Sequence, residues 1–254
     1  YTYFIYMYIL YVYFVCIFYC FNLNTFLYYV LMISNITINK NNILIKNINI
    51  DIQLLINIIN KNNYFNNLEI SIYNFNTINL NFFDYKPLSL KKYIYNYYNF
   101  DYSITLSFFK KLSKLFNIFN DNNISIINFN INDFVYINQE IYFIAFHKLQ
   151  NIKNNFIFID QIIEYSQFNS PDTLSIKSIP NNIHYKSYYF SIAILLFHFF
   201  NQTDINFDNF NNLKEDEYEN KLKNILLFFI GTPFYYFIQR ILLYNPQDRL
   251  LIFI

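Results

Sequence analysis

The sequence predicts an α+β fold in which a strand-rich first part is followed by a mainly helical second part, with an apolar segment ahead of both. Short apolar runs separated by Asn-rich breaks fill residues 34–85, whereas apolar residues at three- and four-residue spacing dominate residues 86–254. The 254 residues are 55% hydrophobic, which suffices for a core and excludes a disordered chain.

The first 33 residues contain no charged side chain and are dense in Tyr, Phe, Ile and Leu. A helix needs about 20 such residues to span a bilayer. The first charges downstream are Lys40 and Lys46, and this positive-inside bias would place the rest of the chain in the cytosol. We therefore expect residues 1–33 to be a transmembrane or leader segment of a membrane-associated protein. The alternatives are a cytoplasmic protein whose Tyr- and Phe-rich start forms strands, or translated non-coding sequence.

Residues 34–85 predict several short strands around one helix. The helix is expected at 51–59, where apolar residues share one face. The strands are expected at 36–38, 43–45, 68–72 and 78–83.

In residues 86–254 the longest helix is expected at 104–119, which carries an apolar stripe. A second, at 188–200, is apolar on all sides but short for a membrane span, which indicates a buried helix. Further helices are expected at 88–94, 222–229 and 234–243, and strands at 124–127, 134–137 and 141–144. The charged run 214–223 is read as a solvated loop or the start of a helix.

Rare residues exclude several kinds of site. With Gly231 as its single glycine, the chain cannot form a glycine-rich phosphate loop. Two cysteines, Cys16 and Cys20, cannot complete a four-ligand zinc site by themselves or form the disulfide framework of a small secreted protein. A net charge of +1 does not indicate a basic surface that would bind nucleic acid. Residues with AT-rich codons, such as Asn and Ile, are abundant throughout, so the Asn tracts are weak indicators of function.

Three motifs in the second half follow one another in a recognisable order. They are Ser170-Pro171-Asp172, the stretch His184-Tyr-Lys-Ser-Tyr-Tyr-Phe-Ser-Ile-Ala193, and Leu242-Leu-Tyr-Asn-Pro-Gln-Asp-Arg249. They resemble the Ala-Pro-Glu, Lys-Ser-Asp-x-Trp-Ser-x-Gly and Leu-x-x-Asp-Pro-x-x-Arg motifs of eukaryotic protein kinases. The resemblance extends backwards to residues 81–94 at the hinge, 126–132 at the catalytic loop and 141–147 at the Asp-Phe-Gly segment.

The resemblance implies a protein-kinase-like bilobal fold, with a small strand-rich N-lobe at 34–85 and a mainly helical C-lobe at 86–254. It also implies that the catalytic groups are missing. Kinases use a carboxylate base and magnesium-binding Asn and Asp side chains, and this chain has other residues at those positions. Asn130 stands at the position of the base, and an amide cannot accept the proton. The degenerate catalytic-loop positions are Asn128, Phe129, Asn130 and Val135, and the degenerate Asp-Phe-Gly positions are Ala145, Phe146 and His147. In the central helix, Tyr188 stands where the family has the Asp that braces the catalytic loop.

Two lysines, Lys46 and Lys40, are candidates for the nucleotide-binding lysine, and Lys46 is the one we assign. Asp51 is the acid that could pair with it, although it lies close to Lys46 in sequence for the strand and helix order of the family. The competing interpretation is that both lysines lie in solvated loops.

The resemblance also implies a structural ion pair between Asp172 and Arg249. Removing one partner of such a buried pair destabilises a protein by about 3–5 kcal/mol. This cost would explain why Arg249 is retained in a chain that has two arginines. The alternative is that both are exposed surface charges. We expect the two side chains to be in contact.

The expected function is that of a catalytically inactive pseudokinase, a scaffold or regulatory module that binds another protein, with possible membrane association through residues 1–33. No metal, cofactor or nucleic acid is expected. One alternative is a divergent active Ser/Thr kinase using ATP and magnesium, although Asp133 and Glu140 do not have the required spacing. Another is an Ile/Asn-rich repeat interaction protein, although no sustained period of about 20–29 residues is found. A non-expressed gene remnant would also account for the lost motifs.

Overall fold

The computed structural model describes residues 35–39, 42–65, 68–81, 87–96, 102–161, 163, 166–200, 210 and 213–253. The expectation of a membrane segment at residues 1–33 lies outside these residues and stays a prediction, as does any role for Lys40. Among the helices of the described ranges, none combines the length and apolar character that a bilayer crossing requires.

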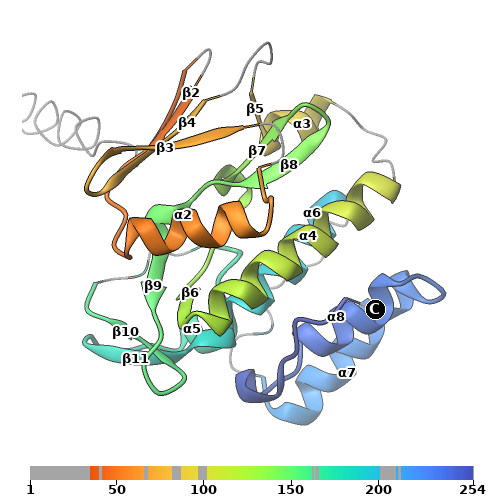
Figure 1. Ribbon diagram of the computed structural model, residues 1–254. Helices are drawn as coiled ribbons and strands as arrows, with labels where there is room; N and C mark the ends of the chain where they lie inside the picture. The colour runs from red at the N-terminus through yellow and green to blue at the C-terminus, as the bar shows by residue number, and fades with distance from the viewer. Residues whose placement is uncertain are drawn as a thin grey trace, which may run out of the picture.

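The fold is α+β, as the sequence predicts, with small antiparallel sheets. Its first part is a four-stranded sheet in the order β1-β2-β4-β3, with every neighbouring pair antiparallel. The strands are β1 (Ile36–Ile38), β2 (Asn42–Ile45), β3 (Glu69–Asn74) and β4 (Thr77–Asn81). Figure 1 shows the helix α2 (Ile52–Lys61) running beneath this sheet.

The helix α2 forms where the sequence offers both a cap and an apolar stripe. The Asp51 carboxylate accepts hydrogen bonds from the backbone N–H groups of Gln53 and Leu54, which satisfies donors at the first turn. Ile52, Leu55, Ile56, Ile58 and Ile59 are buried on its inner face. Together these features position the helix against the sheet.

The second part is built on helices. These are α4 (Tyr102–Asp121), α6 (Tyr189–Phe199), α7 (Glu215–Leu226) and α8 (Phe234–Ile241). The helix α6 is buried along nearly its whole length, as its apolar sequence predicts. Figure 1 shows α4 lying between the strand-rich part and the pair α7 and α8. One apolar core runs through both parts and reaches from Ile43 to Leu251.

The second part also contains three small antiparallel sheets. β5 (Leu88–Ser89), β7 (Phe134–Ile137) and β8 (Glu140–Phe143) form one of them. β6 (Ile124–Ile126) pairs with β9 (Leu149–Asn151), and β10 (Phe156–Ile159) pairs with β11 (Asn181–His184). Asn138 and Gln139 both have positive φ, at 50° and 63°, and close the hairpin between β7 and β8.

Several element boundaries differ from the sequence prediction. The helix expected at 88–94 begins as the strand β5, and α3 (Leu90–Asn96) follows it. The helix α7 starts at Glu215, so the charged run after Lys214 belongs to it, and three of its four acidic residues occupy the first turn, where they suit the helix dipole. The strands β9, β10 and β11 and the short helix α5 (Pro171–Leu174) were not predicted.

Candidate functional site

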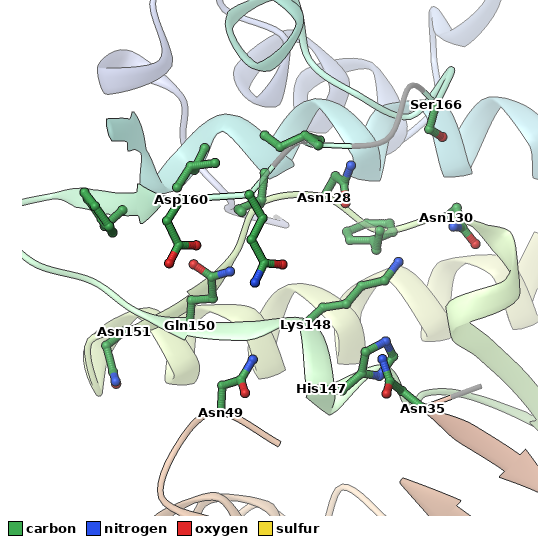
Figure 2. A pocket seen from close by; sticks show the side chains of 16 residues that line it. Asn35, Asn49, Asn128, Asn130, His147, Lys148, Gln150, Asn151, Asp160 and Ser166 are labelled. Atoms are coloured by element: carbon green, nitrogen blue, oxygen red, sulfur yellow. The ribbon is translucent and has the colours of Figure 1, made fainter. Parts of the chain in front are cut away.

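A cavity of about 880 Å³ lies where the segment after β6 meets the segments around β9 and β10. Most of its polar lining is neutral, and Figure 2 shows amide side chains such as Asn128 and Asn49 on different sides of it. The charged side chains of the lining are Lys148 and Asp160. The amides are Asn35, Asn49, Asn128, Asn130, Gln150, Asn151 and Gln161.

Asn128 and Asn130, which the resemblance places in the catalytic loop, form one wall of this cavity. The Asn130 side chain caps the 3-10 turn η1 (Ile131–Asp133) by accepting from the Asn132 backbone N–H at 2.8 Å. In return, the Asn130 backbone N–H donates to the Asp133 carboxylate at 2.7 Å. The Asn128 amide donates to the side-chain oxygen of Asn169. Both amides are therefore committed to holding the loop.

Phe129, between these two residues, also belongs to the cavity lining, and its ring is buried among other aromatic rings. Its side chain is 1% exposed, and its ring stacks on Phe116 with centroids 5.7 Å apart and planes 6° apart. It also contacts Phe134 edge-on at 5.3 Å and Tyr188 at 6.5 Å. Aromatic packing thus fixes the middle of the loop.

Val135 and Ala145 are fully buried, each at 0% exposure. Val135 lies in the middle of a three-stranded sheet, opposite Ser89 on one side and Tyr142 on the other. Ala145 precedes the 3-10 turn η2 (Phe146–Lys148), and Phe146 is also fully buried. At these positions the side chains are apolar and covered by protein, so they offer no ligand atom to the cavity.

His147 and Lys148 supply the basic groups of the cavity. Burial, reinforced by the neighbouring Lys148 charge, lowers the pKa of His147 to about 4, so the ring is neutral at pH 7. Its Nδ1 atom is buried with no hydrogen-bond partner in the described part of the chain. The Lys148 ammonium forms an ion pair with Asp133 at 2.6 Å.

Asp133 is the acid nearest the degenerate loop. Burial raises the pKa of its carboxyl group above the usual value, although Lys148 and the Asn130 backbone N–H pull it down. Since the carboxylate already binds both of these donors, it acts as a structural group that fixes the turn to the start of β9.

The sequence assignment of Lys46 to a nucleotide site finds no support in its surroundings. Lys46 directly follows β2, is outside the cavity lining, and forms no ion pair with any described residue. Its possible partner Asp51 caps α2 instead. The structure does not bring the two side chains together as a pair.

Asp172 and Arg249 are in contact, as the sequence predicts. The Arg249 side chain is 1% exposed, and its Nη2 lies 2.9 Å from the Asp172 carboxylate. The same guanidinium donates to the backbone carbonyls of Leu243, Ser187 and Tyr244. Arg249 thereby ties α5 and the 3-10 turn before α6 to the segment that follows α8.

Several residues of the site were missed by sequence reasoning. Gln150, Asn151, Asp160 and Gln161 reach the cavity because β9 and the end of β10 pass beside the loop. In so Asn-rich a chain their residue types carry no signal. The ion pair between Lys111 and Glu140 was also missed, and it joins α4 to the hairpin of β7 and β8.

No protein-family model matches this chain, and no curated protein sequence matches it either.

Proposed function

We propose that this chain is a protein-kinase-like module that has lost phosphoryl transfer and binds a segment of another protein at the cavity beside its degenerate catalytic loop. The observation that carries the proposal is the state of the loop positions. Val135 and Ala145 are apolar and fully buried, and the Asn130 side chain is engaged in a helix cap. Where the resemblance expects a base and magnesium ligands, the side chains have structural roles.

The buried ion pair supports the kinase-like part of the proposal. The resemblance implies one specific contact between residues 77 positions apart, and Asp172 and Arg249 make it. The order of the elements agrees as well, since a sheet with one helix precedes the helical part and the hairpin of β7 and β8 follows the long helix α4.

The charges of the cavity are poorly suited to a nucleotide. Of its described lining, Lys148 is the cationic side chain, and it already neutralises Asp133. His147 is uncharged at neutral pH. A triphosphate carries several negative charges that need cations, magnesium or a cradle of backbone amides. Neutral amides instead donate to and accept from the peptide groups of an extended polypeptide, which is why we assign the cavity to a protein segment.

The nucleotide half of the proposal is tested by thermal unfolding of the full chain with ATP, with and without magnesium, alongside an assay of phosphoryl transfer to protein substrates. A ligand at about 100 times its Kd stabilises a protein by about 2.7 kcal/mol. We expect no shift in melting temperature and no transfer. A magnesium-dependent rise in melting temperature together with phosphoryl transfer would contradict the proposal and favour the active-kinase alternative.

The polypeptide half is tested by selecting peptides from a displayed random library on the full chain and measuring their affinity for two variants. Gln161→Trp places a bulky ring in the cavity lining, and Gln239→Trp places the same ring on the exposed face of α8. We expect the first variant to lose binding and the second to keep it. Equal binding by both variants would remove the cavity from the proposal.

A further inference from the structure

The turn between α7 and α8 holds three large apolar side chains in solvent. Leu227 is 63% exposed, Phe228 61% and Ile230 62%, and we call these three residues the apolar tip. Figure 1 shows the turn at the outer end of the α7 and α8 pair, away from the strand-rich part. Contiguous exposed apolar groups on a protein surface mark sites that contact another protein or a membrane.

The apolar tip is held outward by the packing beneath it. Phe229, in the middle of the turn, is buried, and its ring contacts Phe197 and Phe200 edge-on with centroids 5.2 and 5.5 Å away. Its carbonyl accepts hydrogen bonds from the backbone N–H and the hydroxyl of Thr232, at 3.0 and 2.8 Å. Gly231 follows with a φ of 79°, which a glycine adopts without strain. The tip residues therefore cannot fold back over the core unless this turn is broken.

The polar groups behind the tip are ordered by charge along α7. Lys223 is exposed in the last turn, one turn before Leu227, whereas the three acidic residues of the first turn lie at the opposite end. Between Glu219 and Asp248 the sequence has no acidic residue. Tyr236, in the first turn of α8, is 60% exposed. From the tip backwards, the order is apolar side chains, then a tyrosine and a lysine, then carboxylates.

This order matches the change of polarity with depth at the surface of a bilayer. Apolar side chains enter the hydrocarbon, tyrosines favour the interface, and lysines extend their ammonium groups toward anionic headgroups. Carboxylates are repelled by the same headgroups. We propose that the turn between α7 and α8 inserts the apolar tip into the surface of an anionic membrane. An apolar pocket of a protein partner would not require the separation of lysine and carboxylates along α7, and the contact involves neither the cavity nor residues 1–33.

A fluorescent label at the tip tests the insertion. Because residues 1–33 are expected to bind membranes by themselves, binding of the whole chain to vesicles is not a sufficient readout. The full chain therefore carries Phe228→Cys together with Cys16→Ser and Cys20→Ser, and the new thiol is labelled with the environment-sensitive dye NBD. It is transferred from non-ionic detergent to vesicles of phosphatidylcholine and phosphatidylserine in equal parts. We expect the NBD emission to shift to shorter wavelength and to be quenched by lipids that carry bromine on their acyl chains.

Two other labelled positions serve as matched controls in the same background. Phe75→Cys replaces a phenylalanine that is 90% exposed in the turn between β3 and β4, and Glu215→Cys labels the far end of α7. All three positions are exposed, so the substitutions should leave the fold intact. The 12 residues of α7 extend over about 18 Å, so its first turn lies well behind the tip. We expect acyl-chain quenching at neither control; absent quenching at Phe228→Cys, or equal quenching at all three labels, would overturn the proposal.

The charge of the lipid and of Lys223 gives a second test with the Phe228→Cys label. A basic side chain near an anionic surface contributes about 1 kcal/mol, so Lys223→Gln should lower the ratio of inserted to free tips about fivefold. Lys61→Gln, at an exposed lysine in the last turn of α2, should leave the ratio unchanged. Vesicles of phosphatidylcholine alone should give weaker quenching. Equal quenching in both lipids would contradict the proposal, and a label that shifts without being quenched would show that protein, and not lipid, covers the tip.

Discussion

Two regions of this molecule treat polar groups in opposite ways. Around Arg249, a buried guanidinium is kept and satisfied by a carboxylate and three backbone carbonyls. In the degenerate loop, Phe129 is buried among aromatic rings, and Val135 and Ala145 are buried without any polar atom in their side chains. A buried charge persists where it joins distant segments of the fold. At the positions where the resemblance places catalytic and metal-binding groups, apolar side chains pack in the core and hold the loop in place.

This difference has a physical basis. Removing one partner of a buried ion pair leaves an uncompensated charge, whereas replacing a whole polar set with well-packed apolar groups is often neutral or stabilising. Tyr188 and Phe129 illustrate the second case, because both differ from the family pattern and their rings are in contact. In the proposed function the loop binds neither nucleotide nor magnesium, so such a change would cost it nothing there.

The largest expected effect concerns the ion pair. Asp172→Ala leaves the Arg249 charge buried without its carboxylate, and we expect the free energy of unfolding to fall by about 3–5 kcal/mol. Urea unfolding at pH 7 measures the change. Asp121→Ala removes an exposed carboxylate at the end of α4 and should stay within about 0.5 kcal/mol. If the two variants lose the same stability, the Arg249 region is no different from the surface.

A second prediction addresses the aromatic side of the comparison. Phe129→Leu and Tyr188→Leu should each destabilise the chain by about 1–3 kcal/mol, because both rings are buried. In the double variant the two losses should fall short of additivity by about 0.5–1.5 kcal/mol, the coupling of a ring pair in contact. Additive losses in this double-mutant cycle would mean that the rings do not jointly hold the loop.

The parts of the fold that sequence predicts well are those with local signals. The helices at 52–61 and 102–121 have an apolar stripe, and β7 has a compact apolar run, so each was expected close to its place. The strands β9, β10 and β11 are three or four residues long and pair with distant segments. Their pairing depends on tertiary structure, which no local pattern records.

The residues of the candidate site also divide into those with a local sequence signal and those that only the tertiary structure brings together. Asp172 and Arg249 were found because arginine is rare in this chain and the motifs around both residues are recognisable. Asp160 and Gln161 were missed because only the path of the chain after β10 brings them to the cavity. Lys46 was assigned from a strand followed by a lysine, and this assignment stays a prediction; Asp51, the acid that could pair with it, caps α2.

A third prediction concerns pH, through the neutral His147 of the loop region. Its folded pKa of about 4 lies below the ordinary value of 6.5. Between these two pH values the His147 ring is protonated in the unfolded chain but neutral in the folded chain. The contribution of His147 to the free energy of unfolding is therefore fully present above pH 6.5 and is lost as the pH falls toward 4. Allowing for solvent access to the ring, we expect a loss of roughly 1–2 kcal/mol.

The measurement for His147 is the difference in unfolding free energy between the parent chain and His147→Gln across this pH range. Nearby Asp133 has a raised pKa, which by itself favours the folded state at low pH, and Lys148 lies beside it as its ion-pair partner. Both groups are present in the two proteins and largely cancel in the difference. A difference that does not vary with pH would show that the ring is freely protonated in the folded state.

The smallest expected effects concern Lys46, which was assigned to nucleotide binding, and Asp51, the acid that could pair with it. Asp51→Ala removes the cap of α2 and should cost about 1 kcal/mol, while Lys46→Ala should change stability by less than about 0.5 kcal/mol because the lysine has no ion pair among the described residues. Their effects in urea unfolding should add in the double variant, since independent sites do not couple. A coupling energy comparable to the cost of the cap would mean that Lys46 and Asp51 interact, and the strand-rich part would then retain a charged pair of its own, as the Arg249 region does.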